Sequence, residues 1–96
     1  MDENKFRKWL SESGKSKKVI SDTISRIKRV EKELGNIDID KEFEKDQCEK
    51  LLKLFKNTGR NEDMCKLKTN LPIGKYSLNV YRYAIHLYMA FKDSLI

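Results

Sequence analysis

The chain has 96 residues and a formal net charge of +6, with 21 Lys and Arg against 15 Asp and Glu. This length accommodates one domain with one modest core, so we expect a single domain over residues 1–96. No apolar run reaches the about 18 residues of a membrane-spanning helix, and the opening MDENKFRK lacks the apolar segment of a secretory signal. We therefore expect a cytoplasmic protein that does not enter membranes.

Helical periodicity begins near the N-terminus and continues through the first third of the chain. The apolar spacing of FRKWL predicts a helix over residues 3–12, which Gly14 ends. A second helix is expected from residue 17 to about residue 34, with Ser16 as its N-cap and Gly35 as its stop. Its predicted apolar positions are Val19, Ile20, Ile24, Ile27, Val30 and Leu34.

The acidic middle of the chain predicts a third helix. The turn NIDID opens this helix, with Asp38 or Asp40 as the cap, and acidic side chains follow in its first turns, where the helix dipole favours them. Phe43 and Cys48 are not at helical spacing, which indicates a break near Lys45.

A short helix is expected before the last one. Asn61 is placed to cap it, and it ends at Leu67 or Lys68 with Met64 and Leu67 buried. The following LPIGKY predicts a turn, because proline and glycine interrupt helical structure.

The stretch SLNVYRYAIHLYMAF is the richest in aromatic and apolar side chains, and it predicts the last helix. Ser77 is expected to cap this helix, which runs to about Asp93. At about 100° per residue, the apolar side chains cover one broad arc. The opposite, polar arc consists of Asn79, Arg82, Tyr83 and His86. Together the elements predict an all-α fold, a compact bundle of four to five helices.

Catalytic and metal-binding patterns are lacking in the sequence. His86 is the single histidine, and Cys48 and Cys65 do not form a C-x-x-C pair, whereas a structural zinc site needs about four such ligands. We expect no enzymatic activity, no metal and no cofactor. Both thiols are expected to be reduced and at least partly buried.

Three groups of polar and basic residues are candidates for contact with a polyanion. GKSKK surrounds the start of the second helix, where backbone N–H groups favour an anion. The second helix also carries a basic strip that includes Arg29 and Lys32. The last helix offers Asn and Arg side chains that can pair with base edges. The candidate DNA-binding residues are Lys15, Ser16, Lys17, Lys18, Lys28, Lys75, Ser77, Asn79, Arg82, Tyr83 and His86.

Two segments resemble a known family. FRKWLSESGKSKKVISDTISRIKRVEKEL is similar to the opening of the SAM-like core-binding domain of phage integrases and other tyrosine recombinases. SLNVYRYAIHLYMAF resembles the last helix of that domain. The resemblance implies a helical domain, from a phage or mobile element, that grips DNA from one side through these two segments. The recombinase catalytic domain would follow and is not in this chain, so we expect either an excised domain, whose partner is that catalytic domain, or a free-standing module.

The expected function is non-catalytic binding of duplex DNA through contacts of Lys and Arg with phosphates, which weaken as salt rises. The alternative is a small protein-interaction module or phage-type inhibitor that binds an acidic surface of a nucleic-acid enzyme. DNA binding predicts that Lys17, Lys18, Lys75 and Arg82 converge on one face. The alternative predicts an exposed apolar patch that includes Ile73, Tyr76 and Tyr83.

Overall fold

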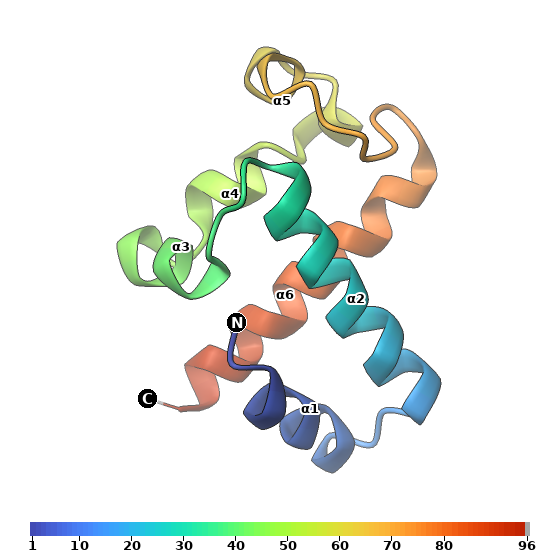
Figure 1. The fold of residues 1–96 in the computed structure, drawn as a ribbon, viewed down its shortest axis with the longest axis vertical. Coiled ribbons are helices and arrows are strands. Elements are labelled where there is room, and N and C mark those ends of the chain that lie inside the picture. Colours follow the sequence, from blue (N-terminus) through green and yellow to red (C-terminus); the bar gives the residue numbers. More distant parts are fainter. Residues whose placement is uncertain (96) are drawn as a thin grey trace.

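Residues 1–95, which the computed structural model describes, fold into six α-helices and two short 3-10 helices (Figure 1). The α-helices are α1 (Glu3–Glu12), α2 (Lys17–Glu33), α3 (Ile39–Asp46), α4 (Glu49–Lys53), α5 (Glu62–Lys66) and α6 (Asn79–Ser94), and the 3-10 helices are η1 (Lys56–Gly59) and η2 (Tyr76–Leu78). The all-α prediction is confirmed. The number of α-helices exceeds four to five because the expected third helix is divided into α3 and α4.

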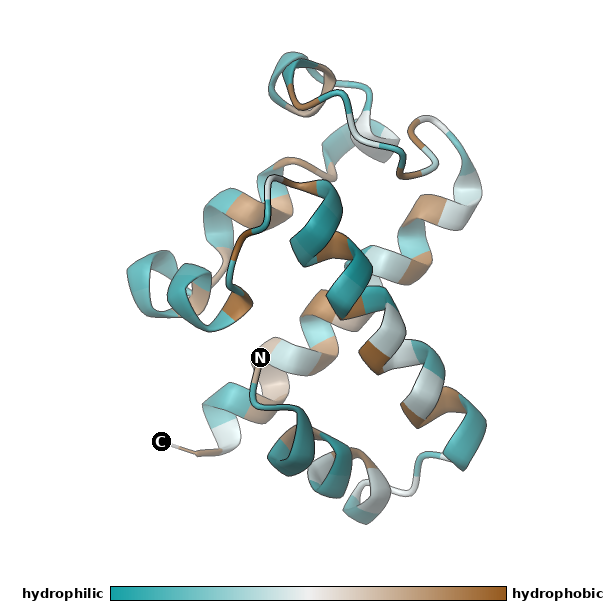
Figure 2. Cartoon of the chain, viewed as in Figure 1, coloured by the Kyte–Doolittle hydropathy of each residue, from teal (hydrophilic) through white to brown (hydrophobic). Residues whose placement is uncertain are grey.

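The long helices α2 and α6 cross at the centre of the molecule, and α1 packs against both at one end (Figure 1). Hydrophobic positions recur along α2 and α6 where they cross, as Figure 2 shows. Phe6 of α1 anchors this end, since its ring centroid lies 4.8 Å from that of Tyr88 and 5.3 Å from that of Phe91. All three side chains are buried, and each contributes about 1.5–3 kcal/mol through its removal from water.

Side-chain caps start three of the helices as the sequence predicts. Ser16 accepts a hydrogen bond from the backbone N–H of Val19 at 3.2 Å, and Asn61 accepts one from Met64 at 2.9 Å. Of the two candidates for the third cap, Asp38 fills the position, since its carboxylate accepts from the backbone N–H of Asp40 at 2.9 Å. Each such cap is worth about 1 kcal/mol.

The predicted break in the third helix is confirmed close to its expected place. Gln47 and Cys48 have φ values of 57° and 64°, in the left-handed region that ends a helix. The turn leaves Cys48 fully buried, and burial raises the pKa of its thiol to about 12. Cys48 therefore behaves as a small apolar side chain.

Four details of the sequence-based prediction are wrong. Ser77 does not cap α6. It lies within η2, which precedes the helix, and no side chain caps the first turn of α6. Val19 is 40% exposed because it lies at the edge of the buried arc of α2. Leu67 is also 40% exposed, since α5 ends one residue before it. Cys65 is exposed because its neighbour Met64 takes the inward position on α5.

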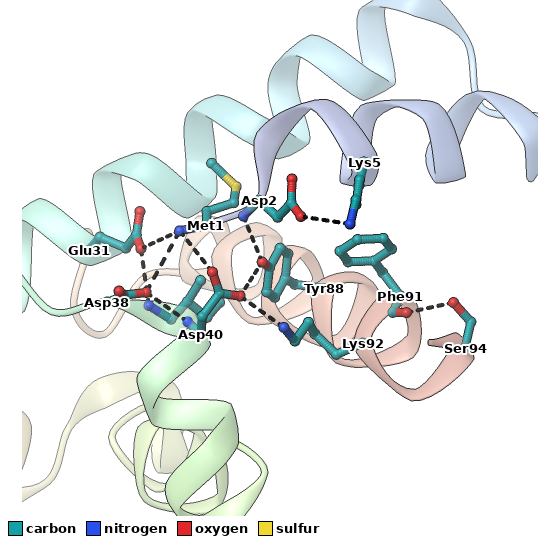
Figure 3. A network of polar contacts seen from close by, with 11 residues as sticks. Met1, Asp2, Lys5, Glu31, Asp38, Asp40, Tyr88, Phe91, Lys92 and Ser94 are labelled. Carbon is teal, nitrogen blue, oxygen red and sulfur yellow. Dashed lines mark hydrogen bonds and ion pairs between the residues drawn. The ribbon is translucent and has the colours of Figure 1, made fainter. Parts of the chain in front are cut away.

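The α-amino group of Met1 lies among three carboxylates that sequence analysis did not connect (Figure 3). Its nitrogen is 3.2 Å from Asp40, and 3.7 Å from each of Glu31 and Asp38. Burial lowers the pKa of the amine, but the hydrogen bond with Asp40 and the nearby negative charges outweigh it, so the pKa lies above the ordinary 8.0. The cluster joins the chain start to α2 and α3.

The hydroxyl of Tyr88 extends this cluster to α6 (Figure 3). It donates a hydrogen bond to Asp40 and accepts one from the backbone N–H of Asp2 at 3.0 Å. Lys92 lies 3.3 Å from the same carboxylate. Burial raises the pKa of Asp40, but the Tyr88 hydrogen bond and the two cations outweigh it and hold that pKa below its usual value. The network therefore fixes the position of α6 relative to α3.

Candidate nucleic-acid interface

A groove of about 620 Å³ lies between the second half of α2 and the segment that leads into α6. Its lining includes Arg26 and Arg29 from α2 and Lys75 from the residue just before η2. The lining contains no Asp or Glu. We call this surface the basic groove. It is formed by Arg26, Arg29, residues 69–73, Lys75, Ser77, Val80 and Tyr81.

Arg29 holds the two walls of the basic groove together. Its Nη1 donates to the hydroxyl of Tyr81 at 2.6 Å, and its Nη2 donates to the backbone carbonyl of Asn70 at 3.2 Å. The guanidinium carbon also lies 5.5 Å from the centroid of the Tyr81 ring, at cation–π distance. From one turn further along α2, the carboxylate of Glu33 accepts from the backbone N–H of Asn70 at 2.8 Å. These contacts fix the loop against α2.

The cations of the basic groove form no ion pair with the carboxylates that the structure describes. None of the ion pairs found within residues 1–95 involves Arg26, Arg29 or Lys75. The hydrogen bonds of Arg29 go to a hydroxyl and a carbonyl, while the Glu33 carboxylate binds the backbone N–H of the same Asn70. Like charges around a hollow surface produce a focused positive potential. The basic groove can therefore attract and hold an anionic group.

A further cation, Arg60, lies beside the groove and packs against Gly74. Gly74 has a φ of 76°, and a Cβ atom at this position would lie 2.4 Å from Nε of Arg60. The backbone N–H of Gly74 donates to the carbonyl of Thr58 at 2.7 Å, which anchors the turn. Because glycine adopts this conformation without strain and leaves room for the guanidinium, Arg60 lies close to the turn that carries Lys75.

The structure places two of the candidate residues, Lys75 and Ser77, in the basic groove. Lys17 and Lys18 are exposed at the start of α2, about 13 Å along the helix axis from Arg26. In Figure 1 the start of α2 and η2 lie at opposite ends of the right-hand edge. The prediction that Lys17 and Lys18 converge with Lys75 on one face is therefore wrong, because the length of α2 separates the start of that helix from the groove.

The other candidates around α2 have structural contacts of their own. Ser16 is the N-cap of α2, and Lys15 beside it is half-buried. Lys28 contacts α1 through a 2.7 Å ion pair with Glu3. The hydrogen bond from Lys28, followed by that from Arg7, holds the pKa of Glu3 below its usual value. Lys28 is thereby engaged away from the basic groove.

The polar arc of α6 is exposed, as predicted. Asn79, Arg82, Tyr83 and His86 all face outward, and none of them lines the groove. Tyr83 nevertheless follows Val80 by three residues, so the two side chains lie on neighbouring parts of the helix surface. Since Val80 lines the groove, the polar arc begins where the groove ends.

Sequence analysis missed Arg26 and Arg60. Arg26 lies at the edge of the buried arc of α2, where its side chain reaches the groove rather than the predicted basic strip. One signal was available in the sequence, because residues 64–92 hold five Lys or Arg and no Asp or Glu. That acid-free segment supplies the loop and α6 sides of the groove.

Comparison with known proteins gives no match among family models, curated proteins or solved structures. Within the described residues, no cluster of three or more His, Cys, Asp or Glu side chains is arranged to hold a metal ion. Over the same range, no helix has the length and apolarity needed to cross a bilayer.

Proposed function

We propose that the chain is a non-catalytic DNA-binding module in which the basic groove is the main phosphate-binding surface. One observation carries the proposal: Arg26, Arg29 and Lys75 line a single hollow, and no ion pair found within residues 1–95 involves them. Arginine side chains bind phosphate oxygens through two parallel hydrogen bonds, and lysine adds a point charge. Contacts of this kind supply most of the affinity of proteins for DNA.

The polar arc of α6 is proposed as the second contact. Asn79 and Arg82 are exposed and have side chains that can pair with base edges. The all-α fold agrees, at the level of fold class alone, with the resemblance to core-binding domains of tyrosine recombinases. Lys17 and Lys18 at the start of α2 then contribute from a separate site, through their charge and the helix N-terminus.

The proposal is tested by titrating a fluorescently labelled duplex with the protein between about 50 and 200 mM salt. Replacing Arg26 and Lys75 together with alanine removes two phosphate contacts, so the slope of log K against log salt should become shallower by about 1.8. The matched control replaces Lys53 and Lys66, which pair with glutamates of their own helices at 3.6 and 3.4 Å. This control changes the net charge equally and should leave the slope unchanged.

Two results would count against DNA binding at the groove. Equal effects of the two double substitutions would mean that net charge alone governs affinity. Absence of binding at low salt would favour the second candidate function, a module that binds an acidic protein surface. The exposure of Tyr76 and Tyr83, at 88% and 53%, favours this candidate, because tyrosines are frequent anchors in protein interfaces. Ile73, the third residue of the expected patch, is half-buried.

A further inference from the structure

The basic groove is an open, mostly polar hollow with a positively charged rim, and the half-buried side chains of Pro72, Ile73 and Val80 give it a small apolar floor. Its volume of about 620 Å³ falls within the about 300–1,000 Å³ typical of small-ligand sites. Leu71 and Tyr81 are buried beneath it, and Pro72, Ile73 and Val80 are half-buried. A continuous duplex keeps its bases stacked inside and offers phosphates and sugars to such a surface. The apolar floor therefore has no base face to contact in a regular duplex.

The charged groups of the rim are placed for a phosphate next to that floor. Arg29 is held over the Tyr81 ring by two hydrogen bonds, so its orientation is fixed before any ligand binds. Arg26 and Lys75 come from opposite walls, and neither forms an ion pair with any other described residue. A phosphate between the two walls would therefore be contacted by Arg26 from one side and by Lys75 from the other.

Two exposed aromatic rings flank the groove on its α6 side. Tyr76 lies between Lys75 and Ser77, both of which line the groove, and it is 88% exposed. Tyr83, which is 53% exposed, lies on α6 three residues after Val80, which lines the groove, so its ring is next to that wall. Exposed aromatic rings beside cationic grooves are the usual stacking surfaces for unpaired bases.

We propose that the basic groove binds an unpaired nucleotide, which rests on the proposed DNA-binding function and specifies its substrate class. The base lies on the apolar floor, and its phosphate lies between Arg26 and Lys75. Tyr76 and Tyr83 stack on the neighbouring bases. The chain then prefers single-stranded DNA, or a duplex with an extruded nucleotide, over a continuous duplex.

The test compares three labelled DNAs of the same sequence at one salt concentration: a single strand, a continuous duplex, and a duplex with one bulged nucleotide. The single strand and the bulged duplex should bind about ten-fold or more tightly than the continuous duplex, since each base stacked on an aromatic side chain adds several-fold. Tyr76→Ala should weaken single-strand binding at least about five-fold and leave continuous-duplex binding unchanged. Tyr76→Phe, which keeps the ring, should retain the preference.

The outcomes separate this inference from the proposed function. Equal affinity for the three DNAs, or equal loss of single-strand and duplex binding in Tyr76→Ala, overturns the unpaired-nucleotide site while leaving DNA binding in place. Absence of binding to all three DNAs overturns both. Tyr76 lies on the surface, so loss of the fold is not expected to obscure the result, and far-UV circular dichroism of each variant checks this.

Discussion

Replacement of Tyr88 by phenylalanine tests whether the polar network at the chain start holds the fold together. The substitution keeps the buried ring, which packs on Phe6 at 4.8 Å, and removes only the hydroxyl. Two hydrogen bonds are lost, one donated to the Asp40 carboxylate and one accepted from the backbone N–H of Asp2 at 3.0 Å. The effect on stability therefore isolates the hydroxyl.

The magnitude follows from the two bonds. A hydrogen bond to a charged group contributes about 1.5–3 kcal/mol and a neutral one about 0.5–1.5 kcal/mol. Asp40 keeps its contacts with Met1 and Lys92, so it is not left as an unpaired charge, and a total near 2–3 kcal/mol is expected. For a domain of this size each kcal/mol lowers the melting temperature by about 4–8 °C, which gives a decrease of about 8–24 °C for Tyr88→Phe.

The measurement is urea and thermal unfolding followed by far-UV circular dichroism. Tyr83→Phe is the matched control, because Tyr83 is on the same helix and 53% exposed, and its free energy of unfolding should change by less than about 0.5 kcal/mol. If the two variants were equally stable, the Tyr88 hydroxyl would contribute nothing net, and the network would not be a determinant of the fold.

Three other predictions concern acid, thiol chemistry and a tight turn. Because the folded pKa of Asp40 is below the ordinary 3.8, its stabilisation is complete above that pH and is lost as pH falls through the folded pKa; Asp40→Asn should flatten this decline in acid unfolding curves. Iodoacetamide should modify exposed Cys65 in the native protein, but Cys48 only after denaturation, as mass spectrometry would show. Gly59→Ala would place a Cβ atom 2.8 Å from half-buried Ile73 and 2.9 Å from buried Leu78, so urea unfolding should show a loss beyond that of Gly35→Ala, by about 1–3 kcal/mol. Gly35 also has a positive φ but has open space around it.

The sequence by itself determined the helices and most of their ends. Ser16 and Asn61 cap helices through backbone groups only three residues away, and the break near Cys48 is visible in the apolar spacing. The two faces of α6 also follow from its 3.6-residue period. These features depend on atoms within about one helical turn of each other, so they can be predicted without the remainder of the chain.

Only the tertiary structure decided which cations share a surface. Lys28 forms an ion pair with Glu3 of another helix, whereas Arg26 and Lys75 line the same groove because α2 and α6 cross and Arg29 binds Tyr81, 52 residues away. Exposed cations carry no local signal of their eventual neighbours, since water solvates each of them equally well in an isolated helix. Their positions in space are set by how the apolar faces of α2 and α6 pack together, and the basic groove exists as a consequence of that packing.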